Sequence, residues 1–215
     1  MYVSNKQLHD EYVNYRSYSK IQKLFSFDAE TNGLWGQPFS IGAVVTERGI
    51  PVDQFIGTCP IEGEVNEWVE QNVLPQCGEI THPDLPSLLA DFGKFYYKHR
   101  EGAMFIAHMG YIVEAYLLRL MFEQGVIDVW DAPFPLHDVA SIIYGVDGNA
   151  PDDRKRFNPT SVDESLLVYK RAHHEHLIRL KDAYADATKE IDGKTHNPLW
   201  DSYQAAKLVS LMFMQ

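Results

Sequence analysis

The strongest chemical signal in this chain of 215 residues is a pair of carboxylates separated by one residue. Asp28 and Glu30 lie at the end of an apolar run, and a turn marked by Asn32 and Gly33 follows. If the run is a strand, residues i and i+2 share a face, so the two side chains stand side by side. Adjacent carboxylates repel each other unless a cation lies between them. The pair therefore predicts a metal site, and the alternative is two solvated acids at a strand end.

A third carboxylate, Glu114, falls in the segment 112–124, which has the apolar spacing of a helix. At about 100° per residue, Arg119 and Glu123 lie roughly 140° and 180° around the axis from Glu114. Glu114 is thus placed among the apolar residues Leu117, Leu118 and Met121. A carboxylate there is costly unless it is paired or bound to a metal. This favours a ligand over the alternative, a helix-start acid stabilised by the macrodipole.

The fourth carboxylate, Asp201, continues the inward apolar stripe of a helix expected at 198–214. The other residues of that stripe are Ala205, Leu208 and Met212. His196 lies in the loop that leads into this helix, where it can reach the same site as Asp201. The alternative for His196 is an ordinary histidine of a surface loop.

These four acids suit hard cations with oxygen ligands, so we expect Mg²⁺ or Mn²⁺ and not zinc. Two such ions about 3.5–4 Å apart stabilise the attacking and leaving oxygens of a phosphodiester displacement. A histidine such as His196 titrates near neutral pH and could take the proton from the attacking water.

The elements that must position these residues follow from hydrophobic periodicity. Strands expected at 23–29, 38–47 and 51–57 have short connections and predict an antiparallel meander. The later expected elements are helices at 65–74 (ended by Pro75), 84–99, 112–124 and 198–214, and short strands at 103–107 and within 133–143. The order predicts the α/β class with a mixed sheet.

We expect an N-terminal arm at 1–22 and one catalytic domain at 23–215, with a loop and helical insertion at about 145–190. The charged stretch 152–156 is interpreted as a solvated surface loop or as a basic loop that touches a substrate backbone. Three histidines cluster in the expected helix 161–190, at His173, His174 and His176. They predict a polar helix surface, because only the first and last share a helical face and no cysteine or acid pair lies nearby.

Composition narrows the function classes. The net charge of -11 argues against a broad basic groove for long duplex nucleic acid, but not against an enzyme that holds a strand end through metals. Cys59 and Cys77 are too few for a disulfide scaffold, which predicts reduced thiols and a cytoplasmic protein. The chain shows no signal-peptide pattern and no run of membrane-spanning length, so no membrane association is expected.

Two motifs resemble those of a known nuclease family. Asp28-Ala29-Glu30-Thr31-Asn32-Gly33-Leu34 is similar to the first motif of the DEDD exonuclease superfamily, Asp-x-Glu-Thr-x-Gly-Leu, which ends the first strand. His196-Asn197-Pro198-Leu199-Trp200-Asp201 resembles the third motif of its histidine-type branch. The resemblance covers about residues 23–214 and implies a ribonuclease H-like fold, with three antiparallel strands followed by alternating helices and strands.

The resemblance implies two-metal hydrolysis of the terminal phosphodiester at a 3′ end, with release of nucleoside monophosphates. It implies that Asp28, Glu30 and Asp201 bind metal and that His196 is the general base. The turn after Glu30 would hold the terminal nucleotide; its residues are Thr31, Asn32, Gly33, Leu34 and Trp35. In the family a leucine packs on the base, while Trp35 fits base stacking or a core role equally.

The second motif departs from the family pattern, in which an aspartate follows a histidine by five residues. Here His108 is followed at that position by Val113, and the acid comes one residue later, as Glu114. Either Glu114 replaces the aspartate through a shifted helix start, or the second metal site is weakened and the enzyme is poor or inactive.

The expected substrate is the 3′ end of single-stranded RNA or DNA, or a short oligonucleotide, with a slight preference for RNA because the compact domain resembles small bacterial and phage exoribonucleases. The alternative is a catalytically weak ribonuclease H-like domain that binds nucleic acid or a protein. A third interpretation is hydrolysis of a small nucleotide or cyclic oligonucleotide signal. The apolar helices and the segment 161–190 would allow a homodimer.

Overall fold

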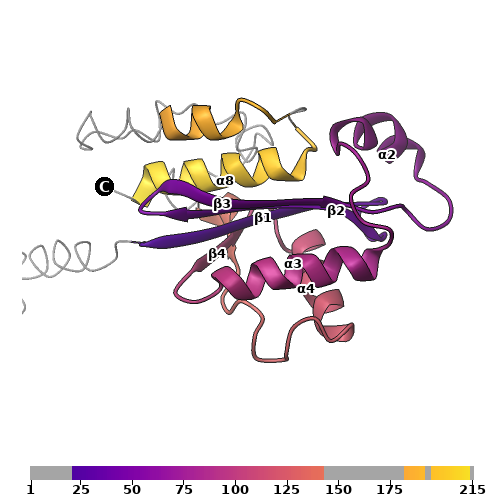
Figure 1. The fold of residues 1–215 in the computed structure, drawn as a ribbon, viewed down its shortest axis with the longest axis horizontal. Helices are drawn as coiled ribbons and strands as arrows, with labels where there is room; N and C mark the ends of the chain where they lie inside the picture. Colours follow the sequence, from indigo (N-terminus) through magenta and orange to yellow (C-terminus); the bar gives the residue numbers. More distant parts are fainter. Residues whose placement is uncertain (1–20, 143–181, 192–194, 214–215) are drawn as a thin grey trace, which may run out of the picture.

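The computed structural model describes residues 21–142, 182–191 and 195–213 (Figure 1). A five-stranded sheet with the order β3-β2-β1-β4-β5 forms its centre. The strands are β1 (Lys23–Thr31), β2 (Pro38–Glu47), β3 (Ile50–Thr58), β4 (Met104–Ala107) and β5 (His137–Asp138). The β1–β2 and β2–β3 pairs are antiparallel, and the β1–β4 and β4–β5 pairs are parallel. The predicted α/β class with a mixed sheet is confirmed.

Helices cover both faces of the sheet. In Figure 1, α8 (Pro198–Phe213) lies on one face, and α3 (Leu85–His99) and α4 (Val113–Glu123) lie on the other. Strand β1 contributes to both cores because its side chains alternate between the faces. Phe25, Phe27 and Ala29 pack in the core on the α3 face, whereas Leu24 packs with residues of α8.

The alternation in β1 decides where its acids point. Leu24 faces α8, so the residues two, four and six positions later share that face with it. Asp28 and Glu30 therefore point towards the α8 side, at the carboxyl end of the strand. Their i, i+2 spacing places the acids on one surface, as the sequence predicts.

The sheet opens next to the end of β1. Strand β4 pairs with β1 only from Leu24 to Ser26, and its last residue is Ala107. Helix α4 then begins at Val113. Past Ser26, the β4 side of β1 is therefore bordered by the loop 108–112 and by the first turn of α4. A helix side chain can reach the backbone of β1 at this opening.

The connection between β3 and α3 contains two short helical segments where the sequence predicts one helix. Helix α2 (Glu67–Asn72) ends before Leu74, and Pro75 lies inside a 3-10 turn, η1 (Leu74–Gln76). The predicted helix 65–74 is therefore wrong at its C-terminal end. Because proline fits the early positions of a helical turn, Pro75 helps to build the second turn and does not end the first.

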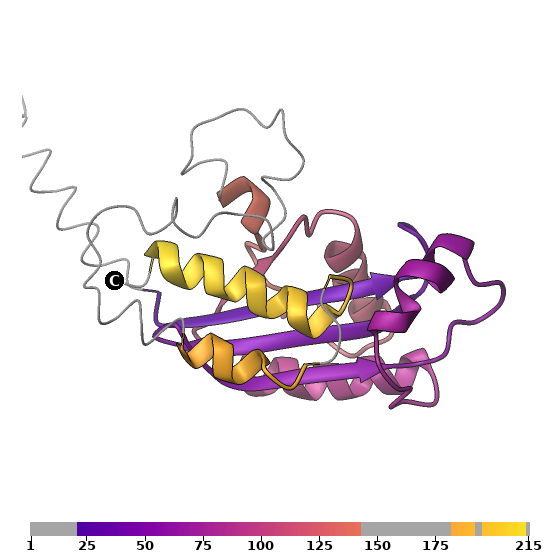
Figure 2. The same cartoon turned by 90° about the horizontal axis from the view of Figure 1, so that it is seen from above.

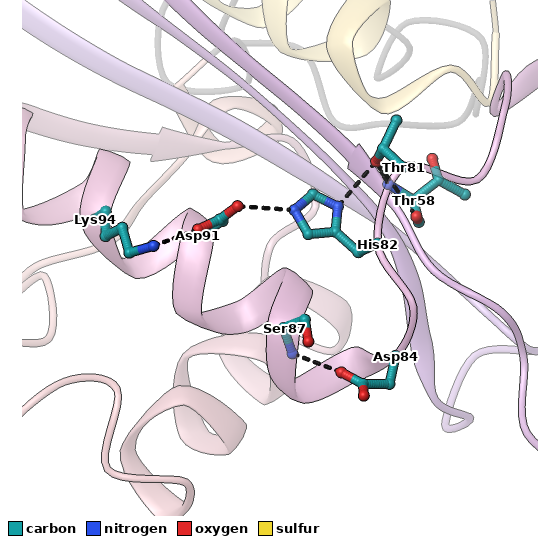
Figure 3. A network of polar contacts seen from close by, with 7 residues as sticks. All are labelled: Thr58, Thr81, His82, Asp84, Ser87, Asp91 and Lys94. Atoms are coloured by element: carbon teal, nitrogen blue, oxygen red, sulfur yellow. Dashed lines mark hydrogen bonds and ion pairs between the residues drawn. The ribbon is translucent and has the colours of Figure 1, made fainter.

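Polar contacts attach α3 to the end of β3 (Figure 3). The Asp84 carboxylate accepts a hydrogen bond from the Ser87 backbone N–H at 2.8 Å and caps the helix. His82 contacts the Thr81 hydroxyl at 2.9 Å through Nδ1 and the Asp91 carboxylate at 3.2 Å through Nε2. This network lies on the α3 face of the sheet.

The described part of the chain from residue 182 onwards contains two helices. Residues 182–188 form a helix that lies beside α8 in Figures 1 and 2. Among the helices that the structure describes, none combines the length and apolar character that crossing a bilayer requires. The stretch 152–156 and the histidine cluster at 173–176 lie outside the described residues. The division into an arm, a domain and an insertion stays a prediction.

Candidate metal centre

Three of the four predicted acids converge. Asp28 and Glu30 come from the end of β1, and Asp201 comes from the first turn of α8. Each offers a carboxylate oxygen, and these oxygens all lie within 4.8 Å of one another. All three side chains are half-buried, so the cluster is open to solvent on one side. Together they could hold a metal ion.

The electrostatics of the cluster favour a bound cation. Burial raises the pKa of Asp28 well above its usual range, and the charges of Glu114, Glu30 and Asp201 raise it further. Burial also raises the pKa of Glu30, and it raises the pKa of Asp201 to about 7. Burial disfavours the charged form of each acid because water is lost, and nearby like charges add to this effect at Asp28 and Asp201. A cation among the oxygens would reverse this penalty.

Glu114 lies next to this group, and one of its two carboxylate oxygens accepts a hydrogen bond from the backbone of β1. The side chain is 3% exposed, and its Oε1 accepts a hydrogen bond from the Ala29 backbone N–H at 3.2 Å. Burial raises its pKa to about 7. The predicted position on the apolar side of α4 is confirmed, since Leu117, Leu118 and Met121 are buried with it. Glu114 borders Asp28 electrostatically but is not one of the three converging acids.

The backbone before α4 explains how Glu114 reaches β1. Met109 has a φ of +55°, and its N–H donates to the Asp138 carboxylate of β5 at 2.8 Å. The chain then passes through Gly110 to a helix start at Val113. Burial lowers the pKa of the neighbouring His108 to about 4, so this histidine is neutral at pH 7.

His196 lies over the acid cluster. Its Nδ1 is 3.7 Å from Glu30 Oε1, and its backbone N–H donates to Asp201 Oδ2 at 2.9 Å. The contact with Glu30 raises the pKa of His196, against the opposing effect of partial burial. The residue has a φ of +69°, a conformation that is uncommon for side chains other than glycine. Its side chain remains 38% exposed and can reach a water or a substrate.

The predicted nucleotide-binding turn has a well-defined structure. Thr31 is buried, and the Asn32 N–H donates to the Gln37 carbonyl at 2.9 Å. The Asn32 side chain accepts from the Asn66 N–H at 2.8 Å and donates to the Glu64 carbonyl at 2.9 Å. Gly33 has a φ of +78°, which an L side chain rarely adopts. The turn is thereby attached to the start of α2.

Two large apolar side chains of this turn are exposed. Leu34 is 56% exposed and Trp35 is 72% exposed. The core alternative for Trp35 is therefore wrong, because the indole projects from the tip of the turn where no core residue covers it. Both side chains are available to contact a ligand.

Trp68 is a candidate site residue that sequence reasoning missed. It lies in α2, it is 55% exposed, and its ring centroid is 5.3 Å from that of His196 in an edge-on arrangement. The Asn66 side chain caps α2 by accepting from the N–H groups of Trp68 and Val69. No local signal links this helix to either motif, since the contact joins segments far apart in the chain.

The site therefore combines two motif-bearing segments with two that carry no motif. Strand β1 supplies Asp28 and Glu30, and the segment from His196 into the first turn of α8 supplies the histidine and Asp201, while α4 and α2 supply Glu114 and Trp68. Compared with models of known protein families, the chain matches none. No curated protein sequence matches it either.

Proposed function

We propose that this protein is a metal-dependent 3′–5′ exonuclease with a ribonuclease H-like fold. The observation that carries the proposal is the convergence of Asp28, Glu30 and Asp201, whose oxygens lie within 4.8 Å of one another. His196 stands 3.7 Å from one of these carboxylates. Phosphodiester hydrolysis with hard cations needs carboxylates that hold the metal and a general base that accepts a proton from the attacking water. The two family-like motifs supply these four residues.

The donor set fits Mg²⁺ or Mn²⁺. Asp28, Glu30 and Asp201 present only oxygen, and the raised pKa values of these acids indicate a site that lacks positive charge. Glu114 would support a second ion from the Asp28 side. When bound, the metal supplies positive charge for the attacking and leaving oxygens.

The residues of the chain then have separate tasks. His196 accepts a proton from the water that attacks the terminal phosphorus. The bond to the 3′ oxygen of the preceding nucleotide breaks, and that oxygen takes a proton from solvent. The products are a nucleoside 5′-monophosphate and a strand shortened by one nucleotide with a free 3′ hydroxyl. Leu34, Trp35 and Trp68 supply apolar and aromatic surface for the terminal base.

We propose single-stranded ends or short oligonucleotides as substrates. Aromatic side chains stack on unpaired bases, which a duplex hides. The net charge of -11 also disfavours long contacts with a duplex backbone. The slight preference for RNA is kept as part of the proposal.

One observation favours a second candidate, a catalytically weak domain that binds nucleic acid or a protein. Glu114 Oε1 accepts a hydrogen bond from Ala29 and does not join the three-acid group. If Glu114 serves only the backbone, the second ion lacks a ligand. Binding would then persist while turnover is poor.

The deciding experiment uses the purified full chain and end-labelled oligomers. Single-stranded RNA, single-stranded DNA and dinucleotides are incubated with Mn²⁺ or with EDTA, and the products are separated. The variants are Asp28→Asn and Asp201→Asn. Asp91→Asn is the control, because it removes a carboxylate from the α3 surface network of Figure 3 and leaves the cluster intact.

We expect Mn²⁺-dependent release of monophosphates by the native chain and by Asp91→Asn, and none by the two site variants. Retained activity in both site variants would overturn the metal-site assignment. Negligible turnover by the native chain together with tight oligomer binding would favour the second candidate. Cleavage of dinucleotides alone would restrict the substrate to small nucleotides.

A further inference from the structure

The loop that carries His196 is held by contacts on both sides of the histidine. His196 itself is in the left-handed region, with a φ of +69°. Such a conformation costs free energy for a residue with a Cβ, so neighbouring groups must maintain it. On one side, its N–H donates to Asp201 Oδ2 at 2.9 Å. On the other side, the contacts come from Asn197 and from the η1 turn.

Asn197 uses both ends of its side-chain amide, and it is 6% exposed. Its Oδ1 accepts from the N–H groups of Leu199 and Trp200, each at 3.1 Å, and so caps α8. Its Nδ2 donates to the Gln76 carbonyl of η1 at 2.9 Å. The first contact needs only an oxygen acceptor, which many capping residues supply. The second needs an N–H donor with the reach of an amide.

The η1 segment contacts the same loop at a second point. The buried Cys77 thiol lies 3.4 Å from the Val73 carbonyl and 3.7 Å from the His196 carbonyl, and it can donate its one proton to either. The preceding helix α2 places Trp68 against the His196 ring. The start of α2 is bonded in turn to Asn32 of the turn after β1. The segment 66–77 therefore joins the nucleotide-binding turn to the His196 loop.

We propose that Asn197 is a positioning residue for His196, and that its amide N–H attaches the His196 loop to η1. The imidazole is thereby kept over Glu30 and against Trp68. This inference rests on the proposed function for its kinetic consequence. The contact between Asn197 and Gln76 places His196 whether or not the chain is a nuclease.

The variant Asn197→Ser distinguishes the role of the amide oxygen from the role of the amide N–H. Serine is a good helix cap and preserves the acceptor for α8, but it has no amide donor that reaches Gln76. Asp84→Ala is the control, because it removes a helix cap from α3 and lowers the thermal midpoint without touching the His196 loop. The measurements are kcat, KM, Mn²⁺ affinity by calorimetry, and the NMR shifts of the His196 ring protons, which the Trp68 ring current displaces.

We expect Asn197→Ser to lower kcat roughly a hundredfold, the size of effect expected from a displacement of about 1 Å at a reacting group. KM and Mn²⁺ affinity should stay near the native values, while the His196 ring signals move towards those of a free histidine. Asp84→Ala should change neither kcat nor these signals.

Native kcat and native His196 signals in Asn197→Ser would overturn the proposal, because the amide would then serve only as a cap. A fall in kcat that matches the fall in Asp84→Ala would overturn it as well, by indicating a general loss of stability. If the native chain has no nuclease activity, the proposed function fails, yet the His196 signals still decide whether Asn197 places the ring.

Discussion

Gly42 lies directly beneath the backbone of Leu199. A Cβ on Gly42 would stand 2.1 Å from the Leu199 nitrogen and 2.2 Å from the Pro198 carbonyl carbon. Gly42 is also the partner of Asp28 in the β1–β2 pairing. The start of α8 therefore reaches the sheet at the position where Asp28 projects, which brings Asp201 to the other two acids. The Ser202 hydroxyl lies 3.0 Å from the Gly42 carbonyl and 2.7 Å from the Pro198 carbonyl, and it can donate its proton to either.

Gly42→Ala should therefore damage the proposed metal site as well as the fold. The added methyl group meets backbone atoms that cannot rotate away, so α8 must move outwards, at a cost of about 1–3 kcal/mol of stability. We expect Mn²⁺ affinity to fall with it. Gly93→Ala is the control, since its Cβ would meet the Val126 side chain at 2.3 Å on the α3 face. It should lose stability and keep Mn²⁺ affinity; equal Mn²⁺ affinity in both variants would contradict the role of Gly42.

The sheet and the direction of each acid could be predicted from local periodicity. The period of two in β1 and the period of 3.6 in α4 and α8 place Asp28, Glu114 and Asp201 on their faces without knowledge of tertiary structure. The antiparallel pairings of β1 with β2 and of β2 with β3 followed from short connections, whereas the parallel pairings of β4 did not. Pro75 shows where this reasoning stops, because a proline can end one helix or begin the next turn.

Contacts between distant segments could not be predicted. Trp68 reaches His196 only because Asn66 and Asn32 join α2 to the turn after β1. The exposure of Trp35 likewise depends on which segments cover the turn. The hydrogen bond from Ala29 to Glu114 arises because β4 separates from β1. None of these follows from spacing along the chain.

The buried acids should cost the metal-free protein stability as the pH rises from about 4 to 7. His108, whose pKa burial lowers from 6.5 to about 4, adds stability over much of the same range. In the fold, burial raises the pKa of Asp201 from 3.8 to about 7, and the pKa values of Asp28, Glu30 and Glu114 are also raised. At these four acids the native state therefore binds more protons than the unfolded state in this range. The stability that each acid contributes is fully present below its pKa in the unfolded chain. It is lost as the pH rises through its higher pKa in the folded protein.

Thermal unfolding in EDTA at several pH values measures this loss. Asp201→Asn should flatten the dependence, because the amide cannot ionise, and saturating Mg²⁺ should raise the midpoint most at pH 8. If the native chain and Asp201→Asn show the same dependence of the midpoint on pH between pH 4 and 7 in EDTA, the Asp201 carboxyl does not lose stability on ionising as the geometry implies.

Glu114→Gln separates a metal ligand from a support for the β1 backbone. Glutamine keeps an oxygen that can accept from the Ala29 N–H, so the fold should remain and the apo protein should gain stability at pH 8. If Glu114 holds a second ion, the Mn²⁺ stoichiometry should fall from two to one and kcat should fall. Calorimetry with Mn²⁺ measures the stoichiometry, and an unchanged value of two would exclude Glu114 as a ligand.

Trp68→Ala should weaken substrate binding more than it slows the chemical step. Stacking of a base on an aromatic side chain contributes about 1–3 kcal/mol, so KM for single-stranded oligomers should rise by roughly 5-fold to 150-fold. Trp130→Ala is a matched control, because Trp130 is 89% exposed and adjoins Asp131, which pairs with Arg100 at the opposite end of the sheet. Equal KM values for the two variants would remove Trp68 from the nucleotide site.

His196→Ala should lower kcat by a factor of roughly 10²–10⁴, the contribution typical of a general base. Mn²⁺ affinity should be retained, since the proposed ligands are carboxylates and the imidazole lies beside Glu30, at 3.7 Å. His82→Ala is the control, because it removes a histidine that bonds to Thr81 and Asp91 on the α3 face. Single-turnover rates with saturating Mn²⁺ compare the three proteins. A native rate in His196→Ala would assign the proton transfer to another group, whereas a slow rate in both variants would trace the loss to stability.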